Sequence, residues 1–155
     1  MTLADGSAAP EFALPDQHGR TVRLAEFRGN QAVVLVFFPF AFSATCRSEL
    51  GELQARRSEF GRAGAELVAV SVDSKYALRA WAEREGFEFP LLADFWPHGE
   101  VARAYGAFLD GAGHAARATF GIDRGGVIRS SFSSPPGVAR PFAAYEATLA
   151  TLASG

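Results

Sequence analysis

Apolar and polar positions along the chain follow two different periods, which indicate strands and helices in alternation. Short apolar runs rich in β-branched and aromatic residues, bounded by turn residues, predict strands. Apolar residues three or four positions apart predict amphipathic helices. The predicted strands are 32–38, 66–71, a short one near 89–92, 118–122 and 127–132, with a short edge strand at 21–24. The predicted helices are 44 to about 60, 75–85, 101–105 and 142–152.

The order of these elements predicts an α/β fold. Alternation in the first two thirds of the chain implies parallel strands joined by right-handed crossovers. The turn at 123–126, with an Asp and paired glycines, predicts a hairpin that adds antiparallel strands. We therefore expect a thioredoxin-like fold, a mixed central sheet with helices on both faces, formed by residues 1–155 as one domain. The Ser- and Pro-rich stretch 130–137 is expected to be a mobile loop.

Composition narrows the class of partner. The chain has 155 residues and a net charge of −2, with no basic stripe, which argues against nucleic acid or an anionic membrane as the main partner. Residues 1–7 have no basic flank or apolar run, so a signal peptide is not expected. The longest apolar stretch, 32–42, is too short to span a bilayer. A single cysteine without a disulfide framework fits a reducing compartment, and we expect the cytoplasm.

That single cysteine, Cys46, falls at a predicted helix start. If Ser43 is the N-cap, Cys46 occupies N3, where a capping box usually carries Glu or Gln. Unpaired backbone N–H groups and the positive end of the helix dipole favour a thiolate there. Pro39 stiffens the loop that enters this helix. The alternative is that Cys46 is a small buried hydrophobe, which many free cysteines are.

Other chemistry has weaker support. Three scattered histidines lie in turns, and any of them near Cys46 would form a hydrolase-type dyad, although no hydrolase motif accompanies them. The chain lacks a C-x-x-C pair, which argues against a thiol–disulfide oxidoreductase, and we expect neither a metal site nor a cofactor. The histidines are His18, His98 and His114.

Several large side chains have alternative interpretations. Phe40 and Phe42 either wall a dry pocket or pack in the core, and core packing is the simpler account. Trp81 and Trp96 are expected to be packing residues. Two aspartates, Asp94 and Asp123, are expected to support turns.

The spacing Pro39-x-x-x-Ser43-x-x-Cys46 resembles the active-site signature of the peroxiredoxins, Pro-x-x-x-(Thr/Ser)-x-x-Cys. The resemblance extends nearly from end to end, through motifs that occur in the family's order. The segment 94–99, without a second cysteine, is most similar to the one-cysteine alkyl hydroperoxide reductase E branch of the family. The further motifs are Ala9-Pro10-Glu11-Phe12, Pro90-Leu91-Leu92-Ala93-Asp94, Val101-Ala102-Arg103-Ala104-Tyr105-Gly106 and Ala116-Arg117-Ala118-Thr119-Phe120-Gly121-Ile122-Asp123.

The resemblance implies a role for each of five residues. Cys46 would be the peroxidatic cysteine, and Arg117 would stabilise the thiolate and donate hydrogen bonds to the peroxide. Pro39 and Ser43 complete the signature, with Ser43 at a position more often held by threonine. Glu49 aligns with a glutamate that orients the arginine, or else is an ordinary exposed helix carboxylate.

The implied activity is a thiol peroxidase that reduces hydrogen peroxide and alkyl or fatty-acid hydroperoxides through a Cys46 sulfenic acid. Because the chain has no second cysteine, an external thiol must recycle it: a low-molecular-weight thiol with a glutaredoxin-like protein (mycothiol and mycoredoxin) or thioredoxin. The family also implies a homodimer. The alternative is a redox sensor on the same fold, in which Cys46 oxidation is read by a partner with little turnover.

Overall fold

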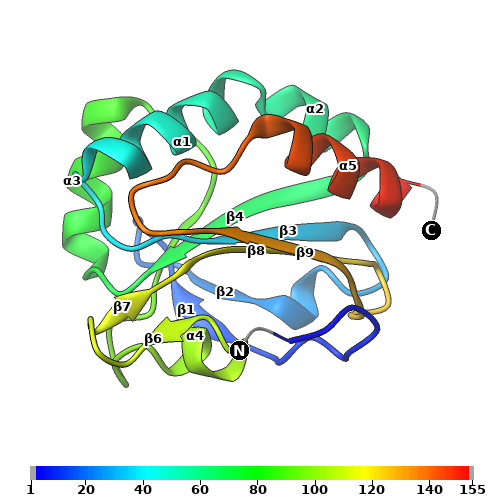
Figure 1. Cartoon of the computed structure of the whole chain (residues 1–155), viewed down its shortest axis with the longest axis horizontal. Helices are drawn as coiled ribbons and strands as arrows, with labels where there is room; N and C mark the ends of the chain where they lie inside the picture. The colour runs from blue at the N-terminus through cyan, green and yellow to red at the C-terminus, as the bar shows by residue number, and fades with distance from the viewer. Residues whose placement is uncertain (1–2, 154–155) are drawn as a thin grey trace.

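The computed structural model describes residues 3–153, and its centre is a five-stranded mixed sheet (Figure 1). The strand order is β5-β4-β3-β8-β9. The first three of these strands pair in parallel, whereas β8 runs antiparallel to β3 and β9 antiparallel to β8. The strands are β3 (Ala32–Phe37), β4 (Ala65–Ser71), β5 (Leu91–Ala93), β8 (Arg117–Ile122) and β9 (Ile128–Ser134).

Helices cover both faces of this sheet, as predicted, but unequally. Four helices pack on one face, where alternate residues of β3 such as Val34 and Val36 point. The other face, which receives Val33 and Leu35, is covered by one short helix and a small hairpin (Figure 1). The helices of the first face are α1 (Ala44–Ala55), α2 (Arg57–Arg62), α3 (Lys75–Glu85) and α5 (Phe142–Ala153), and that of the second is α4 (Glu100–Ala104).

Small elements complete the second face. The predicted edge strand at 21–24 is instead β2, which pairs with an unpredicted β1 in a separate two-stranded sheet and is followed by a 3-10 turn, η1. A second unpredicted hairpin joins β6 to β7. Their bounds are β1 (Ala13–Pro15), β2 (Thr21–Arg23), η1 (Leu24–Glu26), β6 (Phe108–Leu109) and β7 (His114–Ala115). No helix among residues 3–153 is long and apolar enough to cross a membrane.

Two other predictions were wrong. The single helix expected from 44 to about 60 is two helices, because Arg56 leaves the helical conformation (φ −109°, ψ 21°). Its guanidinium lies 3.7 Å from the ring centroid of Phe142 and pairs with Glu59. Much of the expected mobile loop 130–137 belongs to β9, because its serines pair with β8 in a regular register as far as Ser134. Strand pairing here outweighs the low strand propensity of a Ser-rich segment.

The topology brings two distant segments to one edge of the sheet. Strand β3 ends at Phe37, and the chain continues through a loop into α1. Because β8 runs antiparallel to β3, its first residue, Arg117, lies at the edge where β3 ends. Residues about 70 positions apart therefore meet beside the first turn of α1, and their backbones are held by strand and helix hydrogen bonds rather than by mobile loops.

The contact between β8 and α5 gives a test of this packing. A Cβ added at Gly121 would lie 2.5 Å from Thr148 Cγ2, so we expect Gly121→Ala to lower the free energy of unfolding by about 1–3 kcal/mol. Gly51 lies inside α1 with open space around it, and Gly51→Ala should raise that free energy by about 0.5–1 kcal/mol. Urea unfolding measures the change in the free energy of unfolding for both variants. Equal urea midpoints for the two variants would contradict the packing described.

Candidate active site

The first turn of α1 places the only cysteine of the chain at a helix start. Ser43 is the N-cap, as predicted, with an extended backbone and a side-chain oxygen that accepts the N–H of Cys46 at 3.4 Å. Cys46 is thus at N3, where first-turn N–H groups and the helix dipole favour an anion. The cysteine is fully buried, so water does not compete for these interactions.

Arg117 reaches Cys46 from β8. Its Nη1 donates hydrogen bonds to Cys46 Sγ at 3.3 Å and to Glu49 Oε1 at 2.8 Å. The arginine is only 5% exposed, and its Nε–H has no partner within residues 3–153. A buried donor without a partner is costly, and this N–H belongs to the guanidinium that contacts the sulfur, so the guanidinium has a donor left for a further acceptor.

Glu49 is not an exposed helix carboxylate, because it lies buried between two guanidiniums. Its Oε1 accepts from Arg117, and both of its oxygens accept from Arg140 at 2.9–3.0 Å. The backbone N–H of Arg140 also donates to Glu49 Oε2, at 2.6 Å. Of the two interpretations of Glu49, the structure therefore favours the one in which it orients Arg117.

Arg140 is a site residue that the sequence did not reveal. It lies in the segment before α5, its side chain is fully buried, and its Nη1 also donates to the carbonyl of Phe37 and to Thr119 Oγ1. Proximity to Pro141 at the helix start was the only local signal, and that signal says nothing about where the guanidinium points.

These groups form an electrostatic unit with an excess of positive charge. Burial raises the pKa of Glu49. Hydrogen bonds and charge from Arg140, together with the charge of Arg117, lower this pKa by more than burial raises it, so the net shift is downward. An ionised Glu49 between two guanidiniums leaves one positive charge uncompensated. A thiolate at Cys46, within hydrogen-bonding distance of Arg117, would neutralise it.

A mainly apolar cavity of about 210 Å³ adjoins the arginine. Pro39, from the loop before α1, lines it together with Arg117, while β7 and the end of β9 supply most of the remaining wall. The cavity offers a small molecule a route to the guanidinium that contacts the sulfur. Its other lining residues are Leu109, His114, Ala115, Ala116, Ser133, Ser134 and Pro136.

The structure does not bring the histidines to the cysteine. A ring nitrogen of His98 bonds the carbonyl of Gly113, and one of His114 bonds the carbonyl of its neighbour Ala115. His18 is exposed in the turn after β1. Within the described part of the chain no histidine forms a hydrogen bond to Cys46, so the geometry gives no support to a cysteine–histidine dyad.

The aromatic predictions were partly wrong. Phe40 and Phe42 are 41% and 50% exposed, so neither is a core residue, and neither lines the cavity beside Arg117. Trp81 is fully buried, as expected, whereas Trp96 is 80% exposed. All three exposed rings lie outside the helices and strands, in loops.

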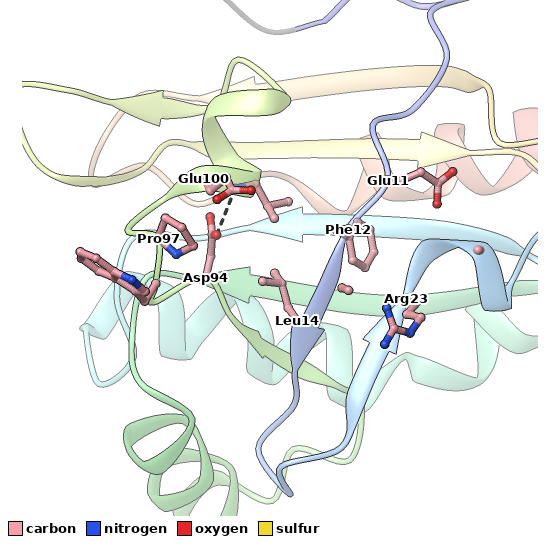
Figure 2. Close-up of a pocket in the computed structure, with 11 residues that line it drawn as sticks. Glu11, Phe12, Leu14, Arg23, Asp94, Pro97 and Glu100 are labelled. Atoms are coloured by element: carbon pink, nitrogen blue, oxygen red, sulfur yellow. Dashed lines mark hydrogen bonds between the residues drawn. The ribbon is translucent and has the colours of Figure 1, made fainter.

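A second hollow of about 450 Å³ lies between β1, β2 and the start of α4 (Figure 2). Asp94, one of three acidic residues that line it, accepts hydrogen bonds from the backbone N–H groups of Val101 and Ala102, so it supports a turn into a helix, as expected. Burial raises the pKa of Asp94. The hollow has no thiol, because Cys46 lies on the other face of the sheet. Asp123, the other predicted turn aspartate, accepts from two backbone N–H groups of its own turn.

Comparisons of the sequence and of the structure with known proteins agree on one family. Residues 6–131 match the model of the AhpC/TSA family. The chain is 44% identical over 147 residues to alkyl hydroperoxide reductase E of Mycobacterium tuberculosis, covering 95% of this chain and 96% of that protein. It superposes on the crystal structure of peroxidoxin BcpB from the same organism with a TM-score of 0.83 and 31% identity, covering 99% and 97% of the two chains. The crystal structure of Enterococcus faecalis AhpC gives 0.85 and 29%, with coverage of 97% and 92%.

The charge cluster predicts how stability depends on pH. Because the pKa of Glu49 is lowered from 4.5 in the folded state, its contribution is complete above pH 4.5 and is lost as the pH falls through the folded value. We expect Glu49→Gln to lower the free energy of unfolding at pH 7 by about 3–5 kcal/mol, because Arg140 is left buried without its counter-charge. The difference from wild type should shrink below pH 4.5.

Urea unfolding between pH 3 and pH 7 is the measurement. Glu83→Gln, which removes one partner of an exposed pair with Arg79, is the matched control and should change the unfolding free energy little at any pH. A Glu49→Gln variant as stable as this control would show that the buried cluster does not hold the fold together.

Proposed function

The chain belongs to the AhpC/TSA family and is a thiol-dependent peroxidase, and we propose that Cys46 carries its reaction by a one-cysteine mechanism. The observation that carries this proposal is the contact between Cys46 Sγ and Arg117 Nη1 at 3.3 Å, in a guanidinium whose Nε–H has no partner in the described part of the chain. The sulfur has a fixed cation, and that cation retains a donor for an oxygen atom.

In the proposed first step the Cys46 thiolate attacks one oxygen of the peroxide. The S–O bond forms as the O–O bond breaks, the attacked oxygen keeps its hydrogen, and the sulfur becomes a sulfenic acid. The other oxygen leaves as hydroxide or alkoxide and takes up a proton to give water or an alcohol. The sulfur is oxidised by two electrons and the peroxide is reduced by two.

Arg117 and its neighbours lower the barrier of this step. Charge grows on the leaving oxygen as the O–O bond breaks, and a preorganised guanidinium in a water-excluded site stabilises that charge. Glu49 holds the guanidinium in place, so little reorganisation is needed when the peroxide arrives. Ser43 fixes the amide of Cys46, and Pro39 lines the cavity through which a small peroxide would approach.

We propose that an external thiol completes the cycle. A thiolate attacks the sulfenic sulfur, water leaves, and a mixed disulfide forms; a second thiol then releases Cys46 and carries away the disulfide. Because the whole sequence has one cysteine, no thiol of the same chain can perform this step. A low-molecular-weight thiol with a glutaredoxin-like protein, or thioredoxin, has the required chemistry. Alkyl and fatty-acid hydroperoxides are proposed substrates alongside hydrogen peroxide.

We also propose that the protein is a cytoplasmic homodimer. A free thiol that must cycle through a sulfenic acid suits a reducing compartment. Exposed aromatic side chains on α3 and on the loop after β5 provide apolar surface that a second copy would cover, and they are Tyr76, Phe95 and Trp96. Sedimentation velocity should give twice the chain mass; a monomer across micromolar concentrations, or export in cell fractionation, would contradict these assignments.

Single-turnover kinetics test the role of Cys46. Mixing the reduced protein with hydrogen peroxide or an alkyl hydroperoxide should change tryptophan fluorescence, because buried Trp81 lies near the loop that leads to Cys46. The second-order rate constant should exceed that of free cysteine. Cys46→Ser should abolish the signal, and a signal that persists in this variant would overturn the proposal.

Steady-state turnover separates the enzyme from the sensor alternative. A peroxidase should consume many equivalents of peroxide per chain when supplied with dithiothreitol, a thioredoxin system, or a low-molecular-weight thiol with a glutaredoxin-like protein. A sensor would stop after one equivalent with each of them. Comparing the three reductants also identifies the class of thiol that recycles the protein.

A further inference from the structure

Phe42 has a backbone conformation that its side chain disfavours. Its φ of +69° lies in the left-handed region, and it is the one non-glycine residue within 3–153 with a positive φ. Bulky L-residues rarely adopt this region, because Cβ approaches the following carbonyl. Such a residue persists only where its surroundings hold it, and these residues concentrate at functional sites.

The surroundings that hold Phe42 are on α3. Its ring centroid lies 6.2 Å from that of Trp81, and the guanidinium of Arg84 lies 6.0 Å from the same ring. Trp81 is itself fixed, fully buried between Phe38 and Phe87. A residue before an N-cap usually packs on the N4 residue of its own helix. Here N4 is the polar Arg47, and Phe42 packs on a neighbouring helix instead.

Phe42 lies between two fixed points of the loop before α1. On one side, the N–H of Ala41 donates to Asp73 Oδ2 at 2.8 Å, which ties the loop to the end of β4. On the other side, Ser43 caps α1 through the N–H of Cys46. The dihedral angles of Phe42 lie between these two points, so they influence whether Ser43 can face the first turn that carries Cys46.

We propose that Phe42 is a positioning residue for the peroxidase reaction. The ring, held on Trp81, keeps residue 42 in the left-handed conformation, and that conformation places the Ser43 cap and Cys46 beside Arg117. The proposal rests on the proposed role of Cys46. It assigns the effect to the backbone of residue 42 rather than to contact between the ring and a substrate, and this difference can be tested.

Three substitutions of Phe42 distinguish the effect of its backbone conformation from the effect of its ring. Phe42→Ala removes the ring and leaves a residue that avoids positive φ. Phe42→Gly and Phe42→Asn also remove the ring, but they supply the two residue types that adopt the left-handed region most readily. Because Phe42 is half exposed, all three variants are expected to fold, which circular dichroism and thermal melting would check.

Two readouts are needed, and one of them does not depend on peroxide. The first is the stopped-flow rate constant with hydrogen peroxide: Phe42→Ala should lose about tenfold or more, while Phe42→Gly and Phe42→Asn stay within about threefold of wild type. The second is hydrogen exchange of the Cys46 amide by NMR. Its protection should fall in the Ala variant and return in the Gly and Asn variants.

Equal rate losses in all three variants would overturn the proposal and assign the effect to the ring itself. Wild-type rates in all three would overturn it as well. If the wild-type protein did not react with peroxide, the proposed function would fail. The exchange pattern would still report whether residue 42 positions the first turn of α1, so the two failures are distinguishable.

Discussion

The carboxylate of Glu49 is the group on which the arrangement of the site depends. It receives Arg117 from the central sheet and Arg140 from the segment before the last helix, and Arg140 in turn binds the carbonyl of Phe37, at the end of β3. Three buried charges thus join α1, β3, β8 and the entry to α5 at one edge of the sheet. Removing the carboxylate would leave two buried guanidiniums close together without a counter-charge.

The same edge shows how the fold divides its tasks. Regular elements carry the charged groups, so the guanidinium beside the sulfur has little freedom. The loop before α1 is irregular but tied down, by Asp73 on one side and by Trp81 beneath the ring of Phe42. Precision at Cys46 therefore comes from several weak anchors that act on one short connection, rather than from one strong contact.

Sequence reasoning predicted the parts of this site that have local signals. A capping serine three residues before a cysteine, after a buried strand, located the first turn of α1. Arg117 could be chosen only through a family resemblance, because its contact with Cys46 spans 71 positions. Arg140 has no local signal for burial, and Phe42 stands where a positive φ would ordinarily be marked by glycine or asparagine. Strands β6 and β7 have two residues each, which is too short for an alternation of apolar and polar residues to be recognised.

Under the proposed mechanism, the complete burial of the single cysteine imposes an order of events in time. In the proposed cycle a peroxide and a thiol, which differ in size, must both reach Cys46 Sγ, although Cys46 is fully buried in the structure. Proteins with two reactive cysteines can carry out the reaction with peroxide and the reaction with thiol at different sulfur atoms. In the cycle proposed for this chain both reactions occur at one sulfur, so they can be separated only in time. Each oxidised chain then holds the two oxidising equivalents of one peroxide until a thiol reacts with it, and the supply of thiol sets the rate at which peroxide is removed.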